Sequence, residues 1–155
     1  MNYWLFKTEP DTFSIDDLIN RPEQTEPWEG VRNYQARNFL RDEVAEGDHV
    51  FIYHSSCKLV GIAGIATVVR AGYADESQFD PDSAYYDPKA DRDDPRWFRV
   101  DVKFKEKFAR VLPLKTIKQM PDITNIGLVK KGHRLSIMPV DQQEWKTLSD
   151  AARQT

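Results

Sequence analysis

A short run between residues 28 and 41, WEGVRNYQARNFLR, gathers side chains that suit the recognition of a planar heterocycle. Its tryptophan and tyrosine offer flat apolar faces, its arginines offer planar cations, and its amides both donate and accept hydrogen bonds. Proteins that bind nucleic acid commonly stack such rings on bases and pair such cations with phosphates. The run holds no obvious nucleophile and no set of metal ligands. The run therefore favours a binding site over a catalytic one.

The polar and aromatic side chains of this run each admit two interpretations. Trp28 either covers the core or forms a wall on which a base stacks, and such stacking contributes roughly 1–3 kcal/mol per base. Asn33 either caps the helix that follows or hydrogen-bonds the edge of a base, and one side chain would struggle to do both. Tyr34 either packs against the protein or forms a second wall, and its polar neighbours favour the second role.

The arginines of the run are candidates for phosphate contacts. Arg37 lies one helical turn after Asn33, so the two share a helix face. It either forms a surface ion pair with a neighbouring acid or contacts a phosphate or a base. Arg41 continues that face and is expected to be plain surface. We predict that Arg32 and Arg37 hold phosphates beside the bound base.

Lys7, Thr8 and Glu9 end the first predicted strand and admit a catalytic interpretation. A lysine at the end of an apolar strand often only extends its ammonium to water. A buried lysine with a lowered pKa and a nearby carboxylate would instead act as a base or nucleophile. Adjacent residues of a strand point to opposite faces, which argues against a site that joins Lys7 and Thr8. We therefore assign Lys7 to phosphate binding.

Further candidates lie at the ends of later predicted strands and in the acidic loop. His54 and Ser55 end a strand, and His54 is either structural or contacts a base edge or phosphate. Tyr86 would close over a ligand if its loop folds back, whereas Trp97 is expected in the core. Arg134 is predicted to face the same pocket from the last strand. The three histidines and one cysteine lack metal-ligand spacing, so neither a metal nor another cofactor is expected.

Composition indicates an ordinary soluble protein with one domain over residues 1–155. The chain is 40% hydrophobic and 30% charged. A formal net charge of -3 excludes a polycation that coats nucleic acid without a local patch. Acids gather at 75–95, and bases gather at 103–118 and 130–134. One cysteine favours a reducing cytoplasm, and the N-terminal segment predicts neither a signal peptide nor a membrane span. We expect a cytoplasmic monomer.

The pattern of apolar residues predicts an α+β fold, a small barrel-like mixed sheet with short peripheral helices. Two pairs predict helix caps with the capping-box spacing, Ser14 with Asp17 and Asp141 with Glu144. The long connection at 74–95 is of a length that is usually functional or mobile. Strands are expected at 3–8, 49–55, 58–70, 97–107 and 135–138, and helices at 14–20, 34–44, 114–120 and after 141.

Six motifs in order give the chain a resemblance to a known family. They are YWLFKTEP at 3–10, WEGVRNYQAR at 28–37, YHS at 53–55, YYDP at 85–88, PRW at 95–97 and RLS at 134–136. Together they resemble the EVE domain family over nearly the whole chain. One departure is Thr8, where the family pattern has serine, and this substitution keeps the hydroxyl group.

The resemblance implies a PUA-like pseudobarrel related to the YTH and ASCH domains. It also implies a reader of modified bases, with modified cytosine in DNA as the leading candidate. We predict a non-catalytic module that binds a modified base in DNA or RNA, with a nuclease or another nucleic-acid-processing protein as a candidate partner. Some ASCH-related proteins are amide hydrolases that use lysine, threonine and glutamate. The rival function is therefore hydrolysis of a modified nucleoside through Lys7, Thr8 and Glu9, and a second rival is a protein adaptor that uses the acidic loop.

Overall fold

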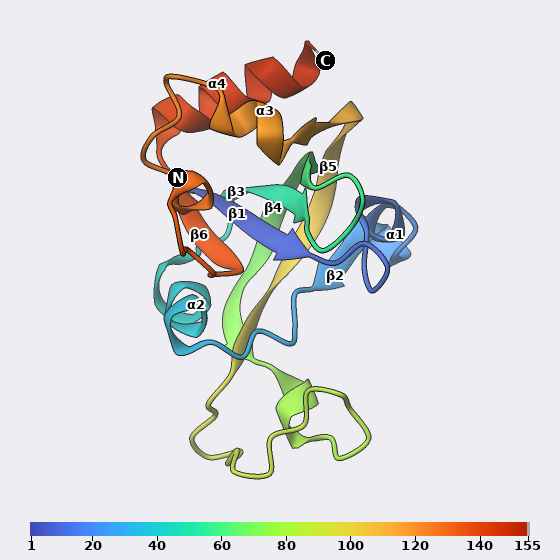
Figure 1. Cartoon of the computed structure of the whole chain (residues 1–155). Helices are drawn as coiled ribbons and strands as arrows, with labels where there is room; N and C mark the ends of the chain where they lie inside the picture. Colours follow the sequence, from blue (N-terminus) through green and yellow to red (C-terminus); the bar gives the residue numbers. More distant parts are fainter. Residues whose placement is uncertain (155) are drawn as a thin grey trace.

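One mixed sheet of six strands forms the centre of the computed structural model, which describes residues 1–154 (Figure 1). The strand order is β2-β5-β4-β3-β1-β6, in which β1 and β3 run parallel and the other neighbours are antiparallel. The strands are β1 (Tyr3–Thr8), β2 (Thr25–Pro27), β3 (His49–His54), β4 (Gly61–Ala74), β5 (Phe98–Pro113) and β6 (Ile137–Val140). The predicted α+β class is confirmed, although the sheet is not closed into a barrel.

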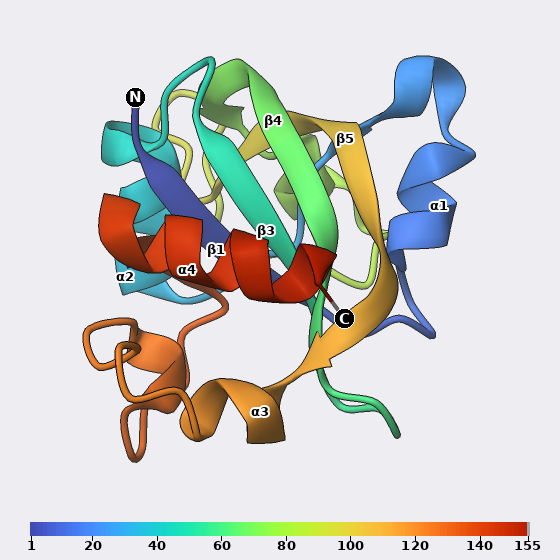
Figure 2. The same cartoon turned by 90° about the horizontal axis from the view of Figure 1, so that it is seen from above.

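Short helices cover the sheet (Figures 1 and 2). Three further single turns are helical, at Pro22–Gln24, Glu76–Phe79 and Gly127–Val129. In Figure 2 the longest helix, α4, crosses over β1 and β3. No helix within residues 1–154 is both long enough and apolar enough to cross a membrane. The helices are α1 (Ile15–Ile19), α2 (Tyr34–Asn38, continued by a π-helical turn at Phe39–Glu43), α3 (Leu114–Lys118) and α4 (Gln142–Arg153).

A hydrophobic core lies on each face of the sheet. Because side chains alternate along a strand, each central strand contributes to both cores. On β1, Trp4 and Phe6 belong to one core, whereas Leu5 belongs to the other. On β3, Ile52 and Phe51 divide between the two cores in the same way. The helices α1 and α2 contribute to the first core, and α3 and α4 contribute to the second. The sheet is therefore a rigid platform from which strand ends and loops project.

The first or last residues of several strands differ from those predicted. β5 extends to Pro113 rather than to residue 107, because its second half pairs with the start of β4 at Gly61. β6 lies at 137–140 rather than at 135–138, since it pairs antiparallel with β1 from Phe6 to Tyr3. Its proline, Pro139, is tolerated because β6 is an edge strand, where a missing N–H costs no ladder bond.

One predicted capping box forms and the other does not. Ser14 Oγ accepts from Asp17 N at 3.1 Å, and Ser14 N donates to Asp17 Oδ2 at 2.8 Å, so the α1 cap is confirmed. Asp141 Oδ1 accepts from Glu144 N at 2.7 Å, which is also as predicted. The Glu144 carboxylate does not return to the cap, and that half of the prediction is wrong. It is 3% exposed and accepts from the backbone N–H groups of residues 124–126 at 2.8–2.9 Å.

The acidic loop is an ordered lobe that extends beyond the sheet (the lower part of Figure 1). Gln78 is fully buried at its centre. Its Nε2 donates to the carbonyl oxygens of Asp75 and Trp97 at 2.7 and 2.8 Å, and its Oε1 accepts from the N–H groups of Arg96 and Trp97. One side chain thus joins the start of the loop to its end. Trp97 is buried, as predicted.

Candidate functional site

A cavity of about 830 Å³ opens where the ends of the parallel strands β1 and β3 meet β2 and the segment before β6. We call it the strand-end cavity. Its lining combines aromatic rings, cations, carboxylates and hydroxyl groups. The main members are Phe13, Trp28 and Tyr85; Lys7, Arg21, Arg32, His133 and Arg134; Glu9, Glu26 and Glu29; and Thr8, Thr12, Ser55, Ser56 and Ser136.

Trp28 packs in the core, as one of the two interpretations predicted, and it also lines the cavity. Its role as a wall for a base stays a prediction. Its side chain is 7% exposed. The indole lies 5.6 Å from the ring of Phe6 and 5.9 Å from that of Phe13, with the second pair nearly perpendicular. Its backbone N–H donates to Val100 O at 2.7 Å, which extends the pairing of β2 with β5. A ring that contacted Trp28 would therefore meet a firmly held surface.

The helical part of the run, Asn33 to Arg37, lies outside this cavity. Asn33 Oδ1 accepts from Ala36 N at 3.0 Å, so the side chain makes the helix cap. Tyr34 is 53% exposed and stacks on Trp97 with ring centroids 4.9 Å apart. Arg37 lies over Tyr34 and donates to the carbonyl oxygen of Arg96 at 2.7 Å. The expected cluster of these three residues with Trp28 is therefore not found, because Asn33 caps the helix, whereas Tyr34 and Arg37 hold the end of the acidic loop.

Arg32 lines the strand-end cavity, but its guanidinium is bound by the acidic loop. It forms an ion pair with buried Asp75 at 3.1 Å and donates to Ser77 Oγ at 3.1 Å and to Tyr85 O at 2.8 Å. Burial alone would raise the pKa of Asp75, but hydrogen bonds from Ser77 and Gly30 and the charge of Arg32 lower it overall. An ionised carboxylate therefore holds Arg32 against the loop.

Tyr85, rather than the predicted Tyr86, reaches the cavity. Gly30 has a φ of +83° and its backbone N–H donates to Asp75 Oδ2 at 2.9 Å. A Cβ atom at Gly30 would overlap the ring of Tyr85, at 2.6 Å from its nearest atom. Glycine is thus needed for the close approach and for the backbone conformation. Tyr86 is exposed and lies outside the cavity.

Lys7, Thr8 and Glu9 all line the cavity, although alternation predicted that Lys7 and Thr8 would diverge. The cavity crosses the end of β1 and so meets consecutive residues. Lys7 is half-buried, its Nζ lies 5.9 Å from the ring centroid of Tyr53, and burial lowers its pKa. No carboxylate within residues 1–154 forms an ion pair with it. Thr8 Oγ1 donates to Phe13 O at 2.7 Å, and Glu9 is exposed.

His54 and Ser55 separate at the end of β3. His54 Nε2 accepts from the N–H of Ile15 at 3.1 Å, so the ring supports the start of α1 and lies outside the cavity. Burial lowers the pKa of His54, which suits a neutral ring that accepts this bond. Ser55 lines the cavity, and its backbone N–H donates to Thr8 O at 2.9 Å. The two side chains therefore do not form a catalytic pair.

The segment before β6 brings Arg134 and His133 to the cavity. Lys7 N donates to Ser136 O at 2.8 Å, which fixes this segment against β1. Arg134 is exposed and forms no ion pair or hydrogen bond within the described residues. The ring of His133 packs on Gly127, and its Nδ1 is buried with no hydrogen-bond partner in residues 1–154. Burial and the charges of Lys7 and Lys130 lower the pKa of His133.

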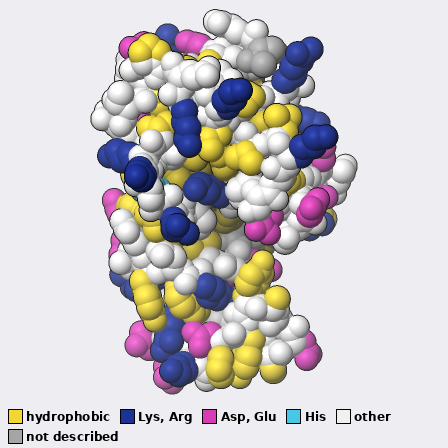
Figure 3. Space-filling view, in the orientation of Figure 1, with side chains coloured by type: hydrophobic (Ala, Val, Ile, Leu, Met, Phe, Trp, Pro, Cys, Tyr) yellow, Lys and Arg dark blue, Asp and Glu magenta, His cyan; other side chains and the backbone are white. Residues whose placement is uncertain are grey.

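Sequence reasoning did not select Phe13, Glu26, Tyr85 or His133. Glu26 had a local signal, because it stands two residues before Trp28 and so points to the same side of an extended chain. The other three reach the cavity through long-range packing. On the face drawn in Figure 3, Lys and Arg side chains spread over the upper part of the molecule, and hydrophobic side chains reach the surface between them.

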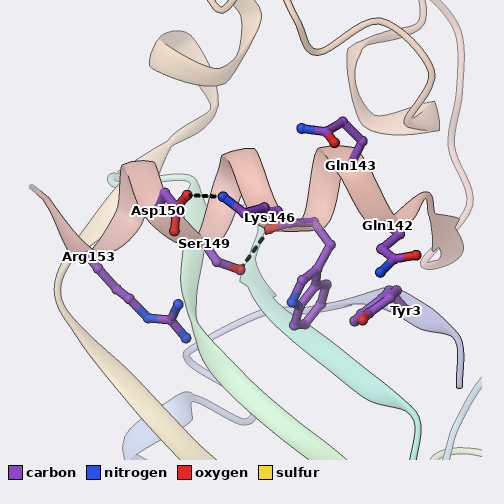
Figure 4. A pocket seen from close by; sticks show the side chains of 8 residues that line it. Tyr3, Gln142, Gln143, Lys146, Ser149, Asp150 and Arg153 are labelled. Atoms are coloured by element: carbon purple, nitrogen blue, oxygen red, sulfur yellow. Dashed lines mark hydrogen bonds and ion pairs between the residues drawn. The ribbon is translucent and has the colours of Figure 1, made fainter.

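A second cavity of about 580 Å³, the α4 cavity, runs along α4 (Figure 4). Lys146 lies 3.4 Å from Asp150, and Arg153 is paired with Glu106 at 2.9 Å. Both of its cations therefore have a carboxylate partner, and we take the strand-end cavity as the candidate binding site. The lining residues are Tyr3, Gln142, Gln143, Trp145, Lys146, Ser149, Asp150 and Arg153.

Comparison with known proteins places this chain in a family. The EVE domain model matches residues 2–151. Thymocyte nuclear protein 1 of Mus musculus is 44% identical over 161 residues, which cover 93% of this chain and 70% of that protein. A protein of Pseudomonas syringae has a crystal structure that matches with a TM-score of 0.92 at 47% identity, over 97% of this chain and 99% of that chain.

A human relative has been crystallised with DNA. Human THYN1 protein in complex with 5-methylcytosine-containing DNA matches with a TM-score of 0.89 at 39% identity, over 98% of each chain. An ASCH protein of Zymomonas mobilis matches at 8% identity with a TM-score of 0.56, over 97% of this chain and 98% of that chain, so only the fold is shared. The resemblance drawn from the six motifs is confirmed, and the chain belongs to the EVE domain family.

Proposed function

We propose that this protein binds nucleic acid and receives a modified cytosine base in the strand-end cavity. The observation that carries the proposal is the joint placement, in one cavity, of a fixed aromatic surface at Trp28 and of two cations, Lys7 and Arg134, that have no ion-pair partner among residues 1–154. The human relative that was crystallised with 5-methylcytosine-containing DNA supports the same ligand class. The cavity volume falls within the range of small-ligand sites.

The aromatic lining would hold the base. A base that leaves the stack of a duplex costs a few kcal/mol, and contact with flat rings recovers part of that cost. The sequence predicted a sandwich between Trp28 and Tyr34. Because Tyr34 stacks on Trp97 outside the cavity, we propose that Trp28, Phe13 and Tyr85 surround the base instead.

Cations at the cavity would hold the flanking backbone. Lys7 and Arg134 are the proposed phosphate contacts, because neither is occupied by a carboxylate among residues 1–154. Arg32 has a structural role in this proposal, since Asp75 and the carbonyl of Tyr85 already bind its guanidinium. With few phosphate contacts and a net charge of -3, binding should be weak without the modified base and should weaken further as salt rises.

The rival proposal is amide hydrolysis through Lys7, Thr8 and Glu9. Their common position in the cavity favours it, but Thr8 Oγ1 already donates to Phe13 O and Glu9 is exposed. We therefore propose a reader without catalytic activity. A nuclease partner, a monomeric state and a cytoplasmic location stay predictions from the sequence.

A binding titration tests the proposal. Fluorescence anisotropy at low salt would compare DNA duplexes that differ only by one 5-methylcytosine in place of cytosine. We expect saturable binding that is tighter for the methylated duplex. Equal binding of both duplexes, or no binding of either, would refute a modified-cytosine reader. Product release from a modified nucleoside by the wild-type protein would instead favour the hydrolase.

A further inference from the structure

The carboxylate of Glu26 stands in the wall of the strand-end cavity with one oxygen unoccupied. Glu26 is the middle residue of β2 and is paired with Val102 of β5, so its backbone is fixed. Its side chain is 25% exposed. Oε1 accepts from Arg21 Nε at 3.3 Å, and Oε2 accepts no hydrogen bond from residues 1–154. Burial raises the pKa of Glu26, and the charge of Arg21 opposes this rise.

Glu26 differs from the other two carboxylates of the cavity. Glu29 is paired with Arg99 at 2.8 Å, so its charge is committed to the protein. Glu9 is exposed to solvent, where a hydrogen bond to a ligand competes with water. Glu26 is the half-buried carboxylate of this cavity with a free acceptor. A donor that reached it from a ligand would meet an acceptor that no protein group within residues 1–154 uses.

The neighbours of Glu26 determine what kind of donor would reach it. Trp28 follows two residues later and lines the same cavity, as does Phe13, over whose ring the Arg21 guanidinium lies at 5.1 Å. A planar ring held by these aromatic side chains presents its edge, not its face, to the surrounding polar wall. The acceptor on that wall therefore selects among groups on the edge of a heterocycle.

We propose that Glu26 accepts a hydrogen bond from the exocyclic amine of the bound base and so selects cytosine-type bases against thymine and uracil. This inference rests on the proposed function. The amine of cytosine donates, and carboxylates commonly accept from it. Thymine has a carbonyl oxygen at the same position, and two acceptors placed together repel. The 5-methyl group plays no part in this selection.

A matched pair of bases isolates the contact. 5-Methylcytosine and thymine carry the same methyl group and differ at position 4 and in the proton on the neighbouring ring nitrogen. Single-stranded oligonucleotides that differ only by these two bases avoid any difference in the cost of base flipping. In anisotropy titrations, we expect the wild-type protein to favour 5-methylcytosine by about tenfold or more.

Two neutralising substitutions then separate Glu26 from the general charge of the cavity. The amide of Glu26→Gln can donate to the carbonyl oxygen of thymine as well as accept from the amine of cytosine. The preference for 5-methylcytosine over thymine should therefore fall to about threefold or less. Glu29→Gln makes the same chemical change in the same cavity and should keep the wild-type preference. Circular dichroism would confirm that each variant is folded.

The outcomes distinguish the inference from the function on which it rests. If Glu26→Gln binds both oligonucleotides with the wild-type preference, the inference is wrong and the reader function stands. If Glu26→Gln and Glu29→Gln lose the preference equally, total charge explains the selection and the inference is again wrong. If the wild-type protein binds neither oligonucleotide saturably, the proposed function fails together with the inference.

Discussion

The strand-end cavity and the α4 cavity are both lined by aromatic and charged side chains, but their charges are arranged differently. In the α4 cavity, Lys146 and Arg153 each have a carboxylate partner. In the strand-end cavity, Lys7 and Arg134 have none within residues 1–154. A cation that already has a partner must give it up to bind a phosphate, whereas an unpaired one need not. We infer that the pairing of charges, more than the types of residue, distinguishes the proposed binding surface from a structural one.

The same contrast separates residues within the strand-end cavity. Arg32 is bound on one side by Asp75 and on the other by the carbonyl of Tyr85, so it positions the aromatic wall. The ammonium group of Lys7 lies 5.9 Å from the ring centroid of Tyr53 and forms no ion pair within residues 1–154. Charges that hold the fold should therefore affect stability when they are removed, and unpaired charges should affect binding.

The largest expected effect is the loss of stability in Glu144→Ala. Removal of this carboxylate leaves three backbone N–H groups at 124–126 without their acceptor, and each unsatisfied group costs about 1–3 kcal/mol. We expect the free energy of unfolding in urea to fall by at least 3 kcal/mol. Gln143→Ala on the exposed face of α4 is the control and should change it by less than about 0.5 kcal/mol. A loss below 1 kcal/mol for Glu144→Ala would mean that water readily replaces the carboxylate.

A smaller effect on stability, with a defined pH dependence, is expected for Asp75→Asn. The folded pKa of Asp75 is lower than the unfolded one, so the unfolded state binds more protons between the two values. Its contribution to stability is present above the unfolded pKa and is lost as the pH falls through the folded pKa. Asp75→Asn should cost about 2 kcal/mol at neutral pH, and the difference from wild type should shrink in acid. Urea unfolding across this pH range measures both effects, and a difference independent of pH would exclude the ionised carboxylate as the cause.

Local signals in the sequence predicted much of the fold correctly. The run from Tyr3 to Thr8 forms a strand with the predicted bounds, because an aromatic-rich segment ends shortly before Pro10. The caps at Ser14 and Asn33 form because each needs only an N–H group within three residues. Such features depend on neighbours along the chain, and the sequence displays those neighbours directly.

The candidate site was harder to predict, because its contacts join distant parts of the chain. Arg32 meets Asp75 across 43 residues, and that ion pair makes a proposed phosphate contact structural. The choice of Tyr85 over Tyr86 depends on the space left by Gly30. Glu144 has the spacing of a capping box, yet its acceptors are used by N–H groups 18 to 20 residues earlier. No local pattern contains these partners.

The most direct test of the two cavities replaces one lysine in each by methionine, which keeps an apolar stem and removes the charge. Lys7→Met should weaken binding of a 5-methylcytosine oligonucleotide by about five- to tenfold and reduce the slope of log K against log salt by about one, because one phosphate contact is lost. Lys146→Met should leave both quantities unchanged, since its ammonium is paired with Asp150 outside the proposed site. Both exchanges should change the free energy of unfolding by less than about 0.5 kcal/mol. Equal losses of affinity in the two variants would show that the charge of the whole surface determines binding, and the distinction between paired and unpaired cations would fail.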